Sequence, residues 1–243
     1  MIDLHSHILP EQDDGARSLS DSLAMARMAL DSGVKVMVAT PHCVGDRARE
    51  TYEAWELLRE ALEESRLPLQ LLPGMEIFGT PDTARLLREG KLFTLNGSRY
   101  PLIEFPFHSD GTEESRILHS VCKLGYRPLV AHPERYAYIQ DNPEILNWWC
   151  RMGCLLQVNK GSLLGRFGYR AQETANELLE RGFATVVASD AHGVRMRTPW
   201  MQEVRQLLSE EFSPKYARKL LWENPGKILK DEEILPAEPE WFE

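Results

Sequence analysis

The chain has 243 residues, with 28 Lys and Arg against 37 Asp and Glu, and its formal charge at pH 7 is −9. This charge argues against broad binding to nucleic acid or to an anionic membrane, because both need a basic surface. No run of about 18 apolar residues occurs, so we expect no membrane insertion. The N-terminus shows no signal peptide and the four cysteines have no CxxC spacing. We therefore expect a cytoplasmic protein without a disulfide framework or a zinc ribbon.

The first predicted element is a short strand within residues 1–7, where Ile2 and Leu4 alternate with polar neighbours. Residues two apart in a strand point the same way, which aims His5 and His7 at one point. Two converging imidazoles suit a divalent transition metal. Such a pair is weak evidence alone, and its weight depends on further ligands elsewhere in the chain.

Helices and strands alternate along the rest of the chain. Apolar runs predict strands over residues 34–39, 69–77, 102–105, 128–132, 155–159 and 184–190. Helical spacing of apolar residues predicts helices over 18–33, 51–65, 80–90, 142–153, 171–181, 201–209 and 214–222, and one more that ends at Gly125. Ser18, with Asp21 three residues later, is expected to cap the first of these helices.

This alternation favours an α/β fold with a parallel sheet. The strands are nearly continuous apolar runs, and no glycine-rich dinucleotide loop follows the first one, so a barrel is favoured over an open sheet. No linker or shift in composition interrupts the chain. We therefore expect one domain over residues 1–243, with an acidic tail from about residue 231.

Imidazoles and carboxylates follow every predicted strand except the one over 155–159, which ends at Asn159. They are His5, His7, Asp14, His42, Glu76, Glu104, His132, Asp190 and His192. Taken singly, Glu104 could pair with a buried arginine and His132 could be a core histidine. In a parallel barrel, however, these strand ends meet at one rim. Carboxylates gathered there would repel each other unless cations compensate, so the joint pattern predicts a metal centre.

The composition of this set bears on the metal. The charges of its four carboxylates and two divalent ions sum to zero. With three divalent ions the net charge is +2, which would favour an anionic substrate. Nine ligands shared among three ions leave positions open for water and substrate. The imidazoles argue against magnesium alone, and the lack of thiolates argues against structural zinc. Manganese, iron or zinc are the expected occupants.

Residues 42–49 also match HCx5R, the motif of cysteine-dependent tyrosine phosphatases, in which Cys43 would attack phosphorus and Arg49 would hold the phosphate. Asp46 stands where that motif has glycine, and Glu50 where it has a hydroxyl residue. An added carboxylate would oppose a phosphate dianion. We interpret the match as a coincidence and keep cysteine chemistry as a remote alternative.

Several motifs give the chain a family resemblance. They are His5-x-His7, Asp14-Gly15, Pro41-His42, Gly74-Met75-Glu76, Leu102-Ile103-Glu104-Phe105, Ala131-His132-Pro133-Glu134-Arg135-Tyr136 and Ser189-Asp190-Ala191-His192. With them the chain resembles the polymerase and histidinol phosphatase (PHP) superfamily over roughly residues 1–229. Within it, Glu104 and the run from Glu134 to Tyr136 resemble the bacterial PHP-type protein tyrosine phosphatases of capsule and exopolysaccharide operons.

The resemblance implies a distorted seven-stranded (β/α)7 barrel with three divalent metal ions at its C-terminal rim. By the family pattern, His5, His7, Glu76 and Asp190 would hold one ion. Glu76 would bridge to a second ion, which Glu104 and His132 also hold. Asp14, His42 and His192 would hold the third, with Asp13 as the alternative to Asp14.

The implied activity is hydrolysis of phosphotyrosine on the tail of a bacterial tyrosine autokinase that controls capsular and exopolysaccharide synthesis. A metal-bridged hydroxide would attack phosphorus. Arg135 and Arg197 would clamp the phosphate, because guanidinium donors match its oxygens, and Arg195 competes with Arg197 for this role. Arg166 and Tyr169 are candidates for shaping a peptide groove.

Two other functions stay open. A PHP-type small-molecule phosphatase would use the same metals on histidinol phosphate or a nucleotide phosphate. A non-enzymatic metal-binding module would keep the metals as structural ions, although open coordination positions argue against this. Trp148 and Trp149 are both expected to pack a helix against the sheet.

Overall fold

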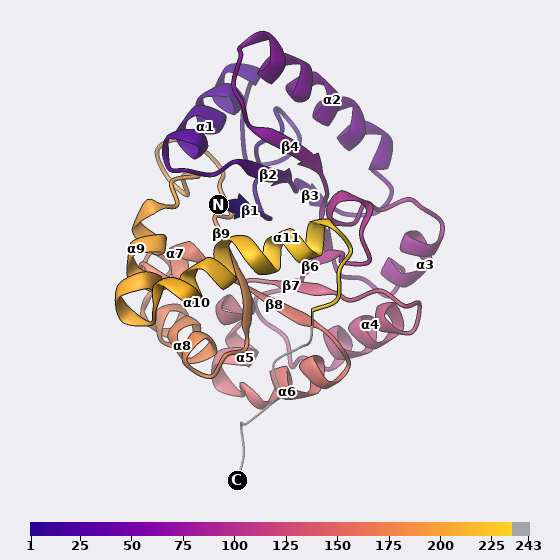
Figure 1. Ribbon diagram of the computed structural model, residues 1–243. Helices are drawn as coiled ribbons and strands as arrows, with labels where there is room; N and C mark the ends of the chain where they lie inside the picture. Colours follow the sequence, from indigo (N-terminus) through magenta and orange to yellow (C-terminus); the bar gives the residue numbers. More distant parts are fainter. Residues whose placement is uncertain (235–243) are drawn as a thin grey trace.

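The structure, a computed structural model, describes residues 1–234 (Figure 1). Most of the acidic tail expected from about residue 231 therefore lies outside the described residues. Figure 1 shows the strands at the centre, the helices around them, and one C-terminal helix lying across the strands. Within residues 1–234, no helix is long and apolar enough to cross a membrane.

The strands of this part of the chain form two parallel sheets. The first has the order β1-β2-β4, with β1 at Ile2–Asp3, β2 at Val36–Ala39 and β4 at Gln70–Pro73. The second has the order β3-β5-β6-β7-β8-β9, with bounds His42–Cys43, Glu76–Phe78, Leu102–Glu104, Leu129–Ala131, Leu155–Asn159 and Ala184–Ala188. Every strand pair is parallel. The predicted α/β class with parallel strands is confirmed.

Two details of the strands differ from the sequence analysis. The strand predicted over 34–39 ends at Ala39 as predicted, but a further short strand, β3, follows beyond Pro41, which has no N–H to donate. The strand predicted over 69–77 is split into β4 and β5 around Gly74, where an added Cβ would lie only 2.8 Å from the Val38 side chain. Backbone hydrogen bonds continue across the breaks, since Glu76 N–H donates to Pro41 O at 3.0 Å.

The residues after β1 and β9 lie side by side and connect the two sheets. His7 N–H donates to Ala191 O at 2.8 Å, and Asp190 N–H donates to His5 O at 2.9 Å. Ser6 and Ala191 form an isolated parallel bridge. The ends of the first and last strands therefore meet, although they are about 185 residues apart in sequence.

Most predicted helices are present with bounds shifted by a few residues: α1 Leu19–Asp31, α2 Ala48–Glu64, α3 Thr83–Arg88, α4 Thr112–Cys122, α6 Glu144–Arg151, α8 Tyr169–Glu180, α9 Gln202–Glu211 and α10 Pro214–Arg218. Ser18 caps α1 as predicted, because its side chain accepts the Asp21 N–H. The helix predicted over 214–222 is instead α10, a π-helical turn at Lys219–Glu223, and α11 at Asn224–Leu229. The short helices α5 Ala137–Asp141 and α7 Lys160–Leu163 were not predicted.

Two apolar clusters hold these elements. The smaller cluster joins one side chain from each of several strands, such as Leu102, Leu129 and Leu155, to Ile228 of α11. The larger one lies between the helices and the sheets and includes the fully buried Trp149. Trp148 is 59% exposed, so the expectation that both tryptophans pack inward is wrong for Trp148. Adjacent helical residues point about 100° apart, and only one of the pair faces the sheet.

Candidate metal centre

All nine predicted ligand residues come together beyond the carboxyl ends of the strands. Each belongs to at least one of four groups whose nitrogen and oxygen atoms lie within 4.8 Å of one another. The groups are His7, Asp14, His42 and His192; His5, His7 and Asp190; His5, Glu76 and His132; and His42, Glu76 and Glu104. The parallel strands explain the convergence, because each side chain stands at a strand's carboxyl end, in the loop that follows it, or at a break within a strand.

Glu76 is the centre of the cluster. Its Oε1 lies 2.9 Å from His132 Nε2 and 3.1 Å from His5 Nε2. Its Oε2 lies 3.0 Å from His42 Nδ1 and 3.2 Å from His7 Nε2. The carboxylate is fully buried, and contacts with four imidazoles place it where one group can bridge two cations.

The grouping around Glu104 differs from the one that the family resemblance implies. Glu104 Oε1 lies 2.7 Å from His42 Nδ1, and these two residues form a group with Glu76. His132 instead forms a group with His5 and Glu76. The register of β3 against β5 places His42 beside Glu76, which brings the His42 imidazole within reach of Glu104.

Asp14, rather than its neighbour Asp13, faces the third group. Asp14 Oδ1 lies 3.4 Å from His192 Nε2 and 3.6 Å from His42 Nε2. Asp13 turns the other way: its Oδ2 lies 2.7 Å from His7 Nδ1 and accepts the His42 backbone N–H. The geometry therefore favours Asp14 among the candidate ligands and gives Asp13 a supporting position.

Burial and neighbouring charges shift the pKa values of these residues in opposite directions. Burial alone would lower the pKa of the imidazoles, but the neighbouring carboxylates raise the pKa of His7 well above its ordinary value and that of His42 to about 10. Burial would raise the pKa of Glu76 and Asp190, but the charge of His5, together with other imidazole contacts, lowers it well below the ordinary value. In the absence of metal, protonation of His7 and His42 would thus offset part of the carboxylate charge.

Two buried polar atoms without hydrogen-bond partners indicate that these residues fit a metal ion. Asp190 Oδ1 and His192 Nε2 are buried and have no hydrogen-bond partner within the described part of the chain. Asp190 Oδ1 lies 3.4 Å from His7 Nε2. Unpartnered buried polar atoms are costly, and coordination to a cation would satisfy both. The mixture of imidazole and carboxylate donors suits manganese, iron or zinc, so the residues fit the group.

Three residues support the candidate ligands: Asp13, which the sequence analysis named as the alternative to Asp14, and Gln157 and Asn159, which it did not select. Asp13 contacts His7, Gln157 Oε1 lies 2.9 Å from His5 Nδ1, and the Asn159 amide donates to Asp190 Oδ2. Metal-binding histidines usually engage their second ring nitrogen in such a contact, which fixes the tautomer and the ring orientation. Gln157 and Asn159 belong to β8, the strand that supplies no ligand of its own.

The backbone adopts a left-handed conformation at three positions of this site. The φ angles are 35° at His132, 50° at Asp190 and 47° at Arg197. This region costs on the order of 1 kcal/mol or more for residues other than glycine, and persists where the surroundings enforce it. Its occurrence at two candidate ligands and a candidate phosphate-binding residue is typical of a functional site.

The two predicted phosphate-binding arginines both contact Asp190 Oδ2. The Arg135 guanidinium also lies over two aromatic rings, 4.7 Å from the Phe107 centroid and 4.2 Å from the Phe167 centroid. The Arg195 side chain makes no ion pair within residues 1–234. Arg197, and not Arg195, is thus the residue that shares Asp190 with Arg135.

The HCx5R match lacks the geometry of a catalytic cysteine. Cys43 is buried, its thiol donates to Gly45 O at 3.5 Å, and burial raises its pKa to about 11. Arg49 points into solvent and pairs with Glu53 at 2.8 Å. A buried neutral thiol without a facing arginine supports the interpretation that the motif is a coincidence.

Comparison with known proteins places these residues in a family context. The family model described as "Capsular polysaccharide synthesis, CpsB/CapC" matches residues 1–230. The tyrosine-protein phosphatase YwqE of Bacillus subtilis is 35% identical, with 99% of this chain and 96% of the relative covered. The tyrosine-protein phosphatase CpsB of Streptococcus pneumoniae is 33% identical, with 96% of this chain and 100% of the relative covered.

Solved structures agree with this likeness. A structure from a study of YwqE from Bacillus subtilis and CpsB from Streptococcus pneumoniae, described as unique metal-dependent tyrosine phosphatases, matches with a TM-score of 0.93 and 35% identity and covers 100% of both chains. The lactonase Lmo2620 of Listeria monocytogenes matches with a TM-score of 0.61 at 12% identity, over 96% of this chain and 95% of the other. At that identity the second match indicates a shared fold only.

Proposed function

The chain belongs to the CpsB/CapC family of capsular polysaccharide synthesis, and we propose that it is a metal-dependent protein-tyrosine phosphatase acting at the cluster around Glu76. Phosphatase relatives at 31–35% identity along almost the whole chain support the activity. The observation that carries the assignment to this site is one buried carboxylate in contact with four imidazoles, beside two arginines.

Part of this proposal is that the strands form one distorted seven-stranded barrel in a single domain, with the metal centre at its C-terminal rim. If β2 with β3 and β4 with β5 are each counted as one bent strand, seven strands result. The bridge between Ser6 and Ala191, which links the first strand to the last, supports closure.

The nine candidate ligands would hold three divalent ions, with manganese expected and iron or zinc as alternatives. Asp14, His42 and His192 would hold one of them, and Glu76 would bridge the other two. When bound, such ions supply Lewis acidity, which activates water for attack on phosphorus and neutralises charge on the phosphoryl oxygens.

The protein's own residues would bind and orient the phosphate. Arg135 and Arg197 both contact Asp190 Oδ2, and the rings of Phe107 and Phe167 hold the Arg135 guanidinium in place. Two planar guanidinium groups can donate to several phosphate oxygens at once. A tyrosine leaving group, with a pKa near 10, needs less protonation than an alkyl alcohol does.

We infer that the physiological substrate is the phosphotyrosine tail of a bacterial tyrosine kinase that controls capsular or exopolysaccharide synthesis, in the cytoplasm. The family description and the names of the relatives support this substrate class. Arg135 and its aromatic neighbours fit an aromatic phosphate ester, because Phe107 is 41% exposed and could contact the substrate ring.

The decisive experiment compares substrates on the manganese-loaded protein. We expect turnover of a phosphotyrosine peptide to exceed that of histidinol phosphate and of a nucleotide phosphate, and to stop when a chelator removes the metal. Arg135→Lys keeps the charge but loses the fork geometry, and should lower kcat/KM roughly 100-fold. Arg151→Lys, on the exposed face of α6, is the matched control. Undiminished activity after rigorous metal removal, or a preference for histidinol phosphate, would contradict the proposal.

A further inference from the structure

A cavity of about 570 Å³ lies beside the metal centre. Asn159 and Arg197 line it and also contact Asp190, so the cavity and the candidate metal centre share a wall. Arg166, which the sequence suggested for a peptide groove, also lines it. Tyr169 does not, since its hydroxyl donates outward to Glu173 at 3.2 Å.

The lining of this cavity is strongly basic in a chain whose formal charge is −9. Its ionisable side chains are Lys160, Arg166, Arg195, Arg197 and the single carboxylate Glu203. Glu203 forms an ion pair with Arg166 at 2.7 Å, and Arg197 forms one with Asp190. Lys160 and Arg195 make no ion pair with a carboxylate within the described residues, although the charge of the buried Asp3 still acts on Lys160.

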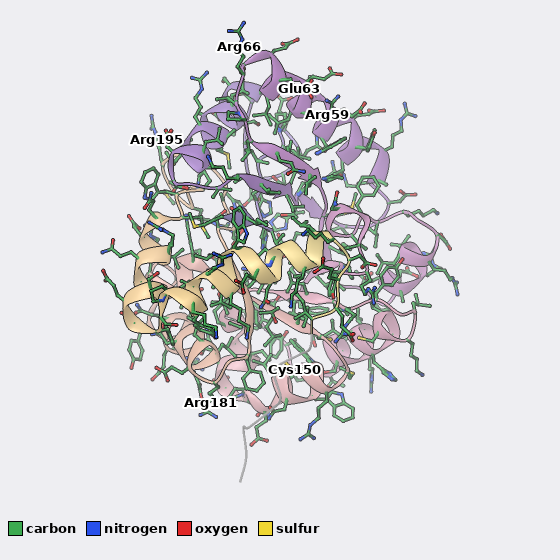
Figure 2. All side chains as sticks on the ribbon, in the orientation of Figure 1. Arg59, Glu63, Arg66, Cys150, Arg181 and Arg195 are labelled. Atoms are coloured by element: carbon green, nitrogen blue, oxygen red, sulfur yellow. The ribbon has the colours of Figure 1, made fainter. Side chains whose placement is uncertain are left out.

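Lys160 is the less usual of these two cations. Its side chain is 1% exposed, and its ammonium donates to the backbone carbonyls of Thr198 and Trp200. A buried charge whose partners are neutral dipoles is costly. A bound anion that reaches Lys160 would offset that cost. Arg195 also lines the cavity and lies at the outer edge of the molecule on the side of α1 (Figure 2), so it would supply a second cation for the same anion.

The remaining walls are apolar or aromatic. Phe167 and Trp200 contribute rings, and Met28 and Met196 contribute flexible thioethers that suit contact with an aromatic group. A volume of about 570 Å³ is also far larger than one carboxylate or one free phosphate would fill. The combination fits an aromatic ring that carries an anionic group.

We propose that this cavity binds a second phosphotyrosine of the same substrate chain, with its phosphate between Lys160 and Arg195, while the phosphotyrosine to be hydrolysed lies at the metal centre. This inference rests on the proposed function and adds a preference to it. Substrates with neighbouring phosphotyrosines are favoured over singly phosphorylated ones, because the shared wall at Arg197 lets one peptide reach both places.

The test uses the manganese-loaded full chain and peptides with one hydrolysable phosphotyrosine. A second position, one to four residues away, carries 4-(phosphonomethyl)phenylalanine, which cannot be hydrolysed, or glutamate, or phenylalanine. We expect kcat/KM to be about tenfold higher with the phosphonate than with phenylalanine at the best spacing, as for one added charge-assisted contact. Glutamate should give little of this advantage.

Variants then locate the effect. Arg195→Gln should reduce the phosphonate-to-phenylalanine ratio to near one, whereas Arg151→Gln, an equal charge change on α6, should leave it unchanged. Equal rates for the phosphonate and phenylalanine peptides, or a ratio that survives in Arg195→Gln, would overturn the inference. A glutamate peptide as good as the phosphonate would replace phosphotyrosine by a carboxylate as the ligand. If p-nitrophenyl phosphate is hydrolysed but none of the peptides is, the proposed protein substrate fails and this inference with it.

Discussion

Replacing Asp13 by asparagine should weaken metal binding although no predicted ligand is removed. Asp13 Oδ2 lies 2.7 Å from His7 Nδ1 and accepts the His42 backbone N–H at 2.8 Å, and Oδ1 accepts the Gly15 N–H at 2.9 Å. Burial would raise the pKa of Asp13, but the contact with His7 and the two backbone bonds lower it to about 2. The carboxylate is therefore ionised and holds the far ring nitrogen of His7 toward Glu76.

The size of the effect follows from the hydrogen bonds. An asparagine side chain offers one acceptor oxygen and one donor NH₂ group, so at least one of the groups now facing a carboxylate oxygen would face a donor instead. Losing one hydrogen bond to a charged group costs about 1.5–3 kcal/mol. That loss corresponds to roughly a 10- to 150-fold weaker metal association constant, in line with the 10- to 100-fold losses typical of such supporting residues.

Competition with a chromophoric chelator measures the affinity, and thermal unfolding of the metal-free variant checks that the fold is retained. Asp21→Asn makes the same chemical change in the first turn of α1, where, among the described residues, the side chain pairs only with the exposed Arg17, and should leave the affinity unaltered. A folded Asp13→Asn protein that binds manganese within twofold of the parent would refute the positioning role.

Three further outcomes are expected. In metal-free protein, burial lowers the pKa of His42 but carboxylates raise it to about 10, above its unfolded value near 6.5. The resulting stabilisation is complete below pH 6.5 and is lost toward pH 10, so the urea midpoint should fall between pH 6.5 and 9, and a rise would contradict this. Cys43→Ser should keep phosphatase activity within about twofold, given a buried thiol, and an inactive but folded variant would restore the cysteine mechanism. Trp149→Ala should lower the free energy of unfolding in urea by about 3–5 kcal/mol, whereas the exposed neighbour Trp148→Ala should cost less than about 1 kcal/mol, and equal losses would argue against the burial difference.

The convergence of the candidate ligands could be predicted because it depends on topology alone. Parallel strands place their carboxyl ends at one edge, so a side chain such as Glu76 or Asp190 needs only a correct strand assignment to be placed near the others. The cap of α1 was predictable for a similar reason, since Ser18 and Asp21 are neighbours in sequence. Local pattern and strand order together determine both features.

The supporting contacts could not be predicted from the same patterns. His5 and Gln157 are 152 residues apart, and a glutamine within an apolar strand gives no sign of which side chain it will meet. The contact of Glu104 with His42, at 2.7 Å, depends on side-chain direction at a break in the strand. Such details require the packed structure, because residue type and spacing leave several partners equally available.

The left-handed residues show that the geometry required by the site conflicts with the backbone conformation that these residue types prefer. The sequence analysis placed His5 and His7 on one side by the alternation of a regular strand, whereas β1 ends at Asp3 and both histidines lie in the segment after it, on either side of the Ser6 bridge. His132 directly follows the last residue of β7 and Asp190 stands two residues after the end of β9, and their φ angles of 35° and 50° break the extended conformation where the side chain turns inward. Glycine would relieve the strain at either position but would remove the ligand. The packed strands β7 and β9 therefore have to hold an unfavourable backbone at these two positions, which is expected where selection acts on the site more strongly than on stability.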